Sequence, residues 1–385
     1  MNAMRIGFTA LLAIATCLLV GCSSGKDAAI EKQLQQMTLQ EKVGQMFIIR
    51  PEALDPEAFY NSPTDLKTIS LQAVNDRMRE TAAKYPMGGI ILFSNNIKDP
   101  AQLHAFVGDL KAMPSHPLLC IDEEGGIVAR LANNKAFHLP KFANMTQLAA
   151  SGKTKDVTEA ASAIGEYLAQ YGFDIDFAPV ADVNTNPRNI VIGPRAFSTD
   201  PDIAATMVKA YLKGLQKNGV LGCLKHFPGH GDTTADSHFG YAMSRKSWDE
   251  IRNCEMIPFK AGISAGAKLV MTAHISLPNV TGSNTPSTLS SLVLQDKLRG
   301  ELGFDGVIIT DAMEMGAIIR QYPVEDACIA AIKAGVDILL CVREYPRVFD
   351  SVVAAVHRGE ISESRIDESV RRILKLRKAS LSKNN

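Results

Sequence analysis

Short, largely apolar runs alternate with longer amphipathic segments along nearly the whole chain. The runs cover residues 43–50, 87–93, 117–121, 173–180, 219–224, 268–272, 306–309 and 336–342. Strands that are apolar at successive positions are covered on both faces, which is typical of parallel strands wrapped by helices. These eight runs predict an α/β fold, a single (β/α)8 barrel of the TIM type.

Apolar residues recur at helical spacing between the runs. We expect helices over residues 30–42, 65–84, 100–113, 154–171, 201–218, 248–265, 290–301, 324–334, 347–358 and 363–378. Thr38 and Glu41 form a start signal for the first of these. No linker rich in Pro, Gly or Ser follows Gly25, so we expect one catalytic domain over residues 34–380.

Charged and imidazole side chains gather at the ends of the apolar runs. They are Asp122, Glu123, Glu124, Asp176, Asp182, Lys225, His226, His274 and Asp311. Unpaired charges next to a core lose several kcal/mol of solvation, so this pattern needs an explanation. A barrel supplies it, because the carboxyl ends of all its strands meet on the face where catalysis occurs.

Two groups form a candidate catalytic pair. Asp311 ends an apolar run after Thr310 and can act as an anionic nucleophile. His238 follows Asp236 by two residues, so a carboxylate can orient the imidazole as a proton donor. A carboxylate together with an acid is what cleavage of a glycosidic bond requires. Asp122, Arg195, Lys225 and His226 can hold sugar hydroxyls.

The composition excludes several classes of partner. The chain has 385 residues, of which 46% are hydrophobic, so it can bury a large core. Its 41 basic residues balance 41 acidic ones. No overall field attracts nucleic acid, so we expect a small, neutral or mixed-charge partner.

The first residues look like an export signal. Arg5 precedes an apolar stretch over residues 6–20 that is too short for a membrane-spanning helix. Residues 19–22, L-V-G-C, resemble a bacterial lipobox, in which Cys22 would become the lipid-bearing first residue. We expect a signal peptide over residues 1–21 and a lipidated tether over 22–33. The catalytic domain would then lie outside the cytoplasm, attached to a bacterial membrane by its lipid alone.

Five further cysteines follow the lipobox. Cys120, Cys223 and Cys341 lie inside apolar runs, where a thiol behaves as a small core side chain. Secreted proteins tend to pair their cysteines, but an odd number argues against a complete disulfide framework. We expect mostly reduced, buried thiols.

One block gives the chain a family resemblance. Residues 225–238, K-H-F-P-G-H-G-D-T-T-A-D-S-H, resemble the signature of the β-N-acetylglucosaminidase branch of glycoside hydrolase family 3. Other blocks follow in the family's order: I-D-E-E-G-G at 121–126, A-P-V-A-D-V-N at 178–184, G-P-R-A-F at 193–197, M-T-A-H-I at 271–275 and I-T-D-A-M at 309–313. The resemblance covers roughly residues 34–376. It implies a retaining exo-β-N-acetylglucosaminidase that needs no cofactor and no metal.

The resemblance also implies roles for individual residues. Asp311 would be the nucleophile, His238 the general acid/base and Asp236 its orienting partner. Ligands of the terminal β-GlcNAc would be Asp122, Arg195, Lys225 and His226. The chain departs from the family where Ile127 replaces an Arg, with Arg130 three residues on, and where residues 239–241 replace a Leu-Pro pair. His230 and Asp232 carry no implied catalytic role, and Glu314 is expected to be structural.

Several questions stay open from the sequence. Peptidoglycan fragments, chitooligosaccharides and glycoconjugates all present β-GlcNAc ends, and neither the acceptor, water or phosphate, nor the oligomeric state is indicated. One rival reading is a metal-dependent barrel hydrolase using His226, His230, His238 and His274, although no H-x-H motif occurs. The other is a glycan-binding lipoprotein that has lost catalysis, which binding without turnover would favour.

Overall fold

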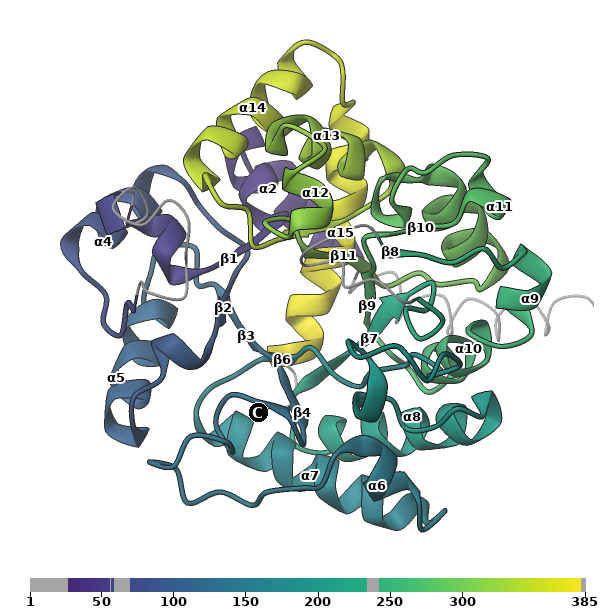
Figure 1. The fold of residues 1–385 in the computed structure, drawn as a ribbon. Coiled ribbons are helices and arrows are strands. Elements are labelled where there is room, and N and C mark those ends of the chain that lie inside the picture. Colours follow the sequence, from purple (N-terminus) through teal and green to yellow (C-terminus); the bar gives the residue numbers. More distant parts are fainter. Residues whose placement is uncertain (1–26, 56, 59–69, 234–241, 382–385) are drawn as a thin grey trace, which may run out of the picture.

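The computed structural model describes residues 27–55, 57–58, 70–233 and 242–381. Within these ranges, eight parallel strands close a barrel in the order β1-β12-β11-β9-β7-β6-β3-β2 (Figure 1). The strands are β1 (Phe47–Ile49), β2 (Gly89–Leu92), β3 (Leu118–Ile121), β6 (Ile175–Asp176), β7 (Leu221–Phe227), β9 (Leu269–Thr272), β11 (Val307–Ala312) and β12 (Ile338–Leu340). The predicted (β/α)8 barrel is confirmed.

Helices surround the ring of strands (Figure 1). The larger ones are α2 (Leu39–Gln45), α4 (Asp76–Lys84), α5 (Pro100–Lys111), α7 (Thr154–Gln170), α8 (Pro201–Gln216), α9 (Trp248–Arg252), α10 (Met256–Ser264), the π-helix η5 (Leu292–Glu301), α13 (Val324–Ala334), α14 (Tyr345–His357) and α15 (Glu363–Leu381). Local sequence sets their starts. Asp99 and Asp200 accept hydrogen bonds from the first-turn amides of α5 and α8, and each precedes a proline.

Short elements decorate the barrel where its strands end. An antiparallel hairpin, β4 (Glu123–Gly125) and β5 (Val128–Ala129), follows β3 directly. A parallel pair joins β8 (Ala242–Met243) to β10 (Ile275–Ser276). The turn η3 (Gly193–Arg195) lies in the long connection between β6 and α8. The hairpin and η3 contribute residues to the lining of the candidate site.

The barrel core is apolar, as the runs predict. Every residue of β1, β2 and β3 is buried. Phe47 from β1 packs its ring edge-on against Tyr345 of α14, with centroids 5.2 Å apart. Cys120, Cys223, Cys328 and Cys341 are buried free thiols, and Cys254 is partly exposed. The prediction of buried thiols is therefore confirmed for the cysteines that the structure describes, apart from this partial exposure.

The first helix and first strand differ from the prediction. The capping box of Thr38 and Glu41 starts a separate helix, α2, which continues to Gln45. β1 therefore begins at Phe47 rather than at Val43. Gly44 lies within this helix, and a Cβ there would lie 2.2 Å from the Pro86 carbonyl oxygen, so the position requires glycine. Val43 and Gly44 are buried like the strand that follows, so the apolar pattern does not separate the helix from the strand.

Three predicted helices also change in extent or type. The helix expected over 65–84 begins at Asp76, where the Asn75 side chain accepts from the Met78 amide. The one expected over 248–265 is divided into α9 and α10. The one expected over 290–301 is a π-helix.

Some predictions lie outside the described residues. These are the signal peptide, Cys22 and the candidate catalytic residues Asp236 and His238. Of the tether expected over 22–33, residues 27–33 are described, and they belong to a helix over 27–36. Among the helices that the structure describes, none combines the length and apolarity needed to cross a membrane.

Candidate active site

A cavity of about 260 Å³ opens at the carboxyl ends of the barrel strands. Its polar lining consists of Asp122, Glu124, Arg130, Arg195, Lys225, His226, His230 and Asp311. Its apolar lining includes Ile91, Phe93, Met271 and Leu340. The cavity therefore brings three acids and three permanent cations around a small space.

The barrel topology positions these side chains. Asp122 follows β3, Lys225 and His226 lie at the end of β7, and Asp311 lies near the end of β11. Arg195 comes from η3, which reaches over from the connection after β6. Residues far apart in the chain meet because parallel strands all end on one face.

Glu124 is the centre of a buried ion network. It receives Arg195 in a bidentate pair, with Nη2–Oε1 at 2.7 Å and Nε–Oε2 at 2.9 Å. The Lys225 Nζ lies 2.6 Å from the same Oε1 and 2.8 Å from Oδ1 of Asp122. Arg130 completes the network with Nη2 at 3.4 Å from Oδ2 of Asp122.

The network fixes the charge of its members. Burial opposes ionisation of Glu124, but Arg195 and Lys225 outweigh it and hold the pKa of this carboxyl well below its usual range. The pKa of Asp122 is lowered in the same way, with burial opposed mainly by Lys225 and Arg130. Burial would lower the pKa of Lys225, but Asp122 and Glu124 raise it. The cavity thus presents fixed charges of both signs, which suits a neutral ligand rich in hydroxyl groups.

Asp182 orients the two histidines of the cavity. Its Oδ2 lies 2.7 Å from Nδ1 of His226, and its Oδ1 accepts from the His230 amide at 2.6 Å. Burial opposes ionisation of Asp182, but His226 and its hydrogen bond lower the pKa of this carboxyl. Burial and the neighbouring His226 lower the pKa of His230. His226 therefore donates from Nδ1 and turns Nε2 toward Arg195, 3.4 Å away.

Asp311 is held at the mouth of β11 by its backbone surroundings. Its Oδ1 accepts from the Ala312 amide at 2.8 Å. The Ala312 carbonyl lies 3.0 Å from Nε2 of His274, which must donate because a carbonyl only accepts. Nδ1 of His274 lies 2.9 Å from the hydroxyl of Thr288. His274 is therefore a structural support behind the strand end that carries Asp311.

The loop after β7 is packed against the segment after β6. A Cβ on Gly231 would lie 1.9 Å from the Val183 carbonyl oxygen, so only glycine fits this approach. Asn189 donates to the His230 carbonyl at 2.7 Å. Asp232 accepts from the Ser244 hydroxyl at 2.8 Å, in agreement with a loop-shaping role. The described loop ends at residue 233, just before the segment with Asp236 and His238.

The structure brings together most of the predicted site. Asp122, Arg195, Lys225, His226 and Asp311 all line the one cavity. Other polar residues at the strand ends do not line it. Glu123 accepts from the amides of Leu131 and Ala132 and holds the β4–β5 hairpin. Asp176 is fully buried, and burial raises the pKa of its carboxyl well above the usual range.

Glu314 also stays outside the cavity lining. Its Oε1 pairs with Nη1 of Arg50 at 3.0 Å, which fits the expected structural role. Burial raises the pKa of this carboxyl, and Arg50 opposes the rise.

Four residues of the site were not assigned a role from the sequence, namely Glu124, Arg130, Asp182 and His230. Glu124 stands directly after the equally acidic Glu123, so the sequence carries no signal that selects it. Arg130 lies beyond the turn of the hairpin, and its guanidinium stands 5.7 Å from the Phe93 ring centre. Asp182 acts through His226, a contact that spacing alone does not reveal.

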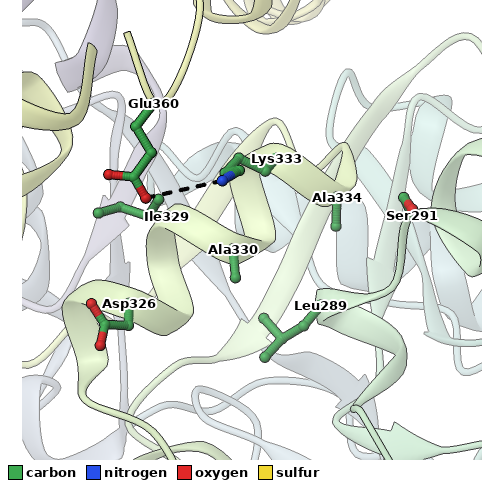
Figure 2. A pocket seen from close by; sticks show the side chains of 8 residues that line it. All are labelled: Leu289, Ser291, Asp326, Ile329, Ala330, Lys333, Ala334 and Glu360. Atoms are coloured by element: carbon green, nitrogen blue, oxygen red, sulfur yellow. Dashed lines mark ion pairs between the residues drawn. The ribbon is translucent and has the colours of Figure 1, made fainter. Parts of the chain in front are cut away.

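A second, larger cavity lies away from this chemistry. It measures about 370 Å³ and lies between α13 and residues 289–291 on the outside of the barrel (Figure 2). Its ion pair, Lys333 with Glu360 at 4.0 Å, joins two half-exposed side chains. Lacking converging buried charges, this cavity is a poorer candidate than the smaller one.

The histidines and acids of the candidate site form no metal centre within the described part of the chain. Among the residues with a described placement, no three His, Cys, Asp or Glu side chains converge in a metal-binding arrangement. The rings of His226 and His230 lie 6.1 Å apart, and both residues bond to Asp182.

Comparisons with known proteins agree on one family. Residues 38–376 match the description "Glycosyl hydrolase family 3 N terminal domain". Beta-hexosaminidase A of Pseudoalteromonas piscicida is 34% identical over 328 residues, which are 78% of this chain and 54% of the relative. Beta-hexosaminidase of Stenotrophomonas maltophilia (strain R551-3) is 35% identical over 274 residues, 70% of this chain and 80% of the relative.

A solved structure is similar over most of the barrel. It is a glycoside hydrolase family 3 β-N-acetylglucosaminidase from Paenibacillus sp. str. FPU-7, with a TM-score of 0.81 and 36% identity. The match covers 91% of this chain and 64% of that one. This chain therefore spans only part of the Paenibacillus and Pseudoalteromonas proteins.

Proposed function

Since the chain belongs to glycosyl hydrolase family 3, as its sequence blocks indicated, we propose that it is a β-N-acetylhexosaminidase that removes terminal β-GlcNAc from glycans. The relatives named as beta-hexosaminidases support this substrate class. We expect action on chain ends, because the cavity has room for about one sugar unit. Its volume of about 260 Å³ is below the roughly 300–1,000 Å³ of pockets that hold larger ligands.

One observation carries the proposal. The carboxylate of Asp311 shares a small cavity with the network of Asp122, Glu124, Lys225 and Arg195. The network offers oxygens and nitrogens to sugar hydroxyls while its own charges are balanced. A neutral sugar can then be bound by hydrogen bonds with its anomeric carbon over Asp311.

The proposed mechanism is a double displacement. Asp311 attacks the anomeric carbon, and His238 protonates the departing glycosidic oxygen, so a glycosyl ester forms and the shortened glycan leaves as an alcohol. His238 then takes a proton from water, which attacks the same carbon and releases Asp311. Asp236 would orient His238. These two residues lie outside the described part of the chain, and their roles rest on the family resemblance.

The product's anomeric configuration tests this mechanism. Proton NMR recorded during hydrolysis of an aryl β-GlcNAc should show the β anomer first, because two inversions at one carbon give retention. Mutarotation then produces the α anomer. First appearance of the α anomer would exclude the covalent route.

Replacing His238 with alanine is expected to affect substrates unequally. A substrate with a poor leaving group, such as a sugar hydroxyl, needs the proton, so its kcat/KM should fall by roughly 100- to 10,000-fold. A dinitrophenyl glycoside needs no proton to depart and should lose far less in its first step. The measurement is kcat/KM for chitobiose and for the aryl glycoside, and equal losses would remove His238 from the acid role.

We further propose that Cys22 carries a lipid and attaches the protein to a membrane outside the cytoplasm. The support is the L-V-G-C block after a short apolar stretch with Arg5 ahead of it. Mass spectrometry of the membrane-extracted protein would show a lipid on Cys22, and a soluble Cys22→Ala variant is the matching control.

A further inference from the structure

The start of the described chain is fixed along α15. Residues 27–36 form a helix whose Asp27 pairs with Lys375 at 3.4 Å and whose Glu31 pairs with Arg371. The partner on α15 moves toward its amino end as the chain advances from Asp27 to Glu31, so this helix lies antiparallel to α15. Ile30 is also 97% buried, with 3% of its surface exposed. The chain therefore enters the fold at α15.

α15 closes the barrel at the amino ends of its strands. Arg377 donates to the carbonyls of Gly88 and His116, just ahead of β2 and β3, at 2.7 and 3.0 Å. Arg365 donates to the Val336 carbonyl, ahead of β12, at 2.8 Å. Figure 1 shows α15 in yellow across the centre of the ring. We call α15 and these preceding loops the barrel floor, and it faces away from the candidate active site.

The chain between the lipid site and the floor is short. The five residues from Cys22 to Asp27 span at most about 18 Å when fully extended. β7 alone has seven residues, about 23 Å along the strand and roughly 18 Å along the barrel axis after tilting. α15 adds a helix diameter of about 10 Å. The tether is therefore too short to reach from the floor to the cavity mouth.

From this placement we propose that the floor faces the bilayer and that the active site opens away from it. The proposal rests on the lipidation of Cys22 and on the proposed hydrolase activity. It narrows the substrate class to glycans lying beyond the headgroup layer, such as released fragments or wall strands. Glycolipids in the same leaflet would lie on the wrong side of the barrel.

A groove in the floor suits contact with lipid headgroups. Its volume is about 360 Å³, and it lies beside the point where the chain enters, because Lys375 lines it and pairs with Asp27. Phe304 and Leu376 give it an apolar base, Lys268 and Arg372 add positive charge to its lining, and Asp305 adds one carboxylate, so its cations, Lys375 included, outnumber its acid. Anionic headgroups complement such a lining. Arg372 is already paired with Asp337, at 3.1 Å, so the lipid on Cys22 remains the main anchor.

Distance-dependent quenching tests the orientation. Full-length lipidated protein is placed in vesicles of phosphatidylethanolamine and phosphatidylglycerol that contain a headgroup spin label. A fluorophore is attached to Asp305→Cys on the floor or to Ile190→Cys beside the cavity, in a Cys254→Ser background. The native side chain of Asp305 is 93% exposed and Ile190 is 84% exposed. We expect the floor probe to be quenched several times more strongly than the Ile190 probe.

The alternative outcomes are distinct. Equal quenching, or stronger quenching at Ile190, would overturn the orientation, as would a full-length protein that does not associate with vesicles. Cys22→Ala should lose both the association and the quenching. Quenching of the floor probe that persists in this variant would mean that the floor binds headgroups unaided, which still supports the orientation.

Activity is measured separately in the same vesicles. Hydrolysis of a soluble aryl β-GlcNAc tests the proposed function, because its outcome does not depend on orientation. Chitobiose in solution should be cleaved, and chitobiose linked to a lipid of the same leaflet should resist. If no substrate is hydrolysed while the floor probe is still quenched, the proposed hydrolase activity is refuted and the orientation is supported. Cleavage of both disaccharides at similar rates would refute the substrate restriction.

Discussion

Replacing Asp311 with alanine is expected to lower kcat/KM for an aryl β-GlcNAc by roughly 10,000-fold or more, the scale of loss when a covalent nucleophile is removed. Asp311 lies in the cavity formed by the ion network, and its Oδ1 accepts from the adjacent Ala312 amide. The fold should survive, because this replacement removes one carboxylate at the edge of a cavity. Steady-state kinetics and thermal unfolding measure the two effects.

Azide provides a second readout for the same variant. A small anion can occupy the space that the carboxylate leaves and attack the anomeric carbon in one step. The aryl alcohol then departs, and the product is a glycosyl azide of inverted configuration. Asp305→Ala is the matched control, because that aspartate is 93% exposed on the barrel floor and should keep normal turnover. Near-normal activity of a folded Asp311→Ala protein would disprove the assignment.

Glu124→Ala is expected to cause the largest loss of stability. The Glu124 side chain is 2% exposed and bonds to both Lys225 and Arg195. Its removal leaves two buried cations sharing Asp122 as a nearby anion, and breaking a buried pair in this way costs about 3–5 kcal/mol in free energy of unfolding. Because both cations line the cavity, KM should also rise. Urea denaturation and steady-state kinetics give the two values.

A matched control comes from the protein surface. Glu159 pairs with Lys155 at 3.7 Å, and these side chains are 66% and 79% exposed. Glu159→Ala should therefore cost about 1 kcal/mol or less. A Glu124→Ala protein as stable as this control would show that the buried network contributes no net stability.

The contribution of Glu124 should depend on pH. Its pKa is held below the usual value of 4.5, so folding favours the ionised form. The stabilisation is present above the unfolded pKa and is lost as the pH falls through the folded pKa. The isosteric Glu124→Gln variant lacks this charge. The difference in unfolding free energy between wild type and Glu124→Gln should shrink as the pH is lowered from about 6 to 3, whereas a constant difference would contradict the assignment.

The strands of this fold are more visible in the sequence than its helix boundaries. Burial on both faces requires apolar residues at successive positions, and each of the eight runs overlaps a barrel strand, although β7 and β11 continue past the ends of their runs. The end of α2 at Gln45 falls instead inside an apolar run, because Val43 and Gly44 are buried in the helix. The division between α9 and α10 likewise interrupts one continuous helical pattern. Such boundaries cannot be read from the local sequence pattern.

The site shows the same division between pattern and contact. Asp122, Lys225 and Asp311 could be predicted because each ends an apolar run, where a barrel gathers its catalytic groups. Among the neighbouring acids, sequence position does not separate Glu124 from Glu123. Glu124 is the centre of the ion network because it pairs with Arg195 and Lys225. Glu123 instead accepts from the Leu131 amide and holds the β4–β5 hairpin. Only the direction of each side chain distinguishes their roles.

The position of α15 bears on when this chain can finish folding. Asp337, fully buried, pairs with Arg372 and Arg365 of α15, and the carbonyls ahead of β2 and β3 accept from Arg377. Arg299 and the Ile308 amide already bond to Oδ2 of Asp337, but its Oδ1 receives donors from α15 alone among the described contacts. Until α15 has been synthesised, this oxygen and the carbonyls of Gly88 and His116 lack those donors. The barrel floor is therefore expected to close only once α15 is in place.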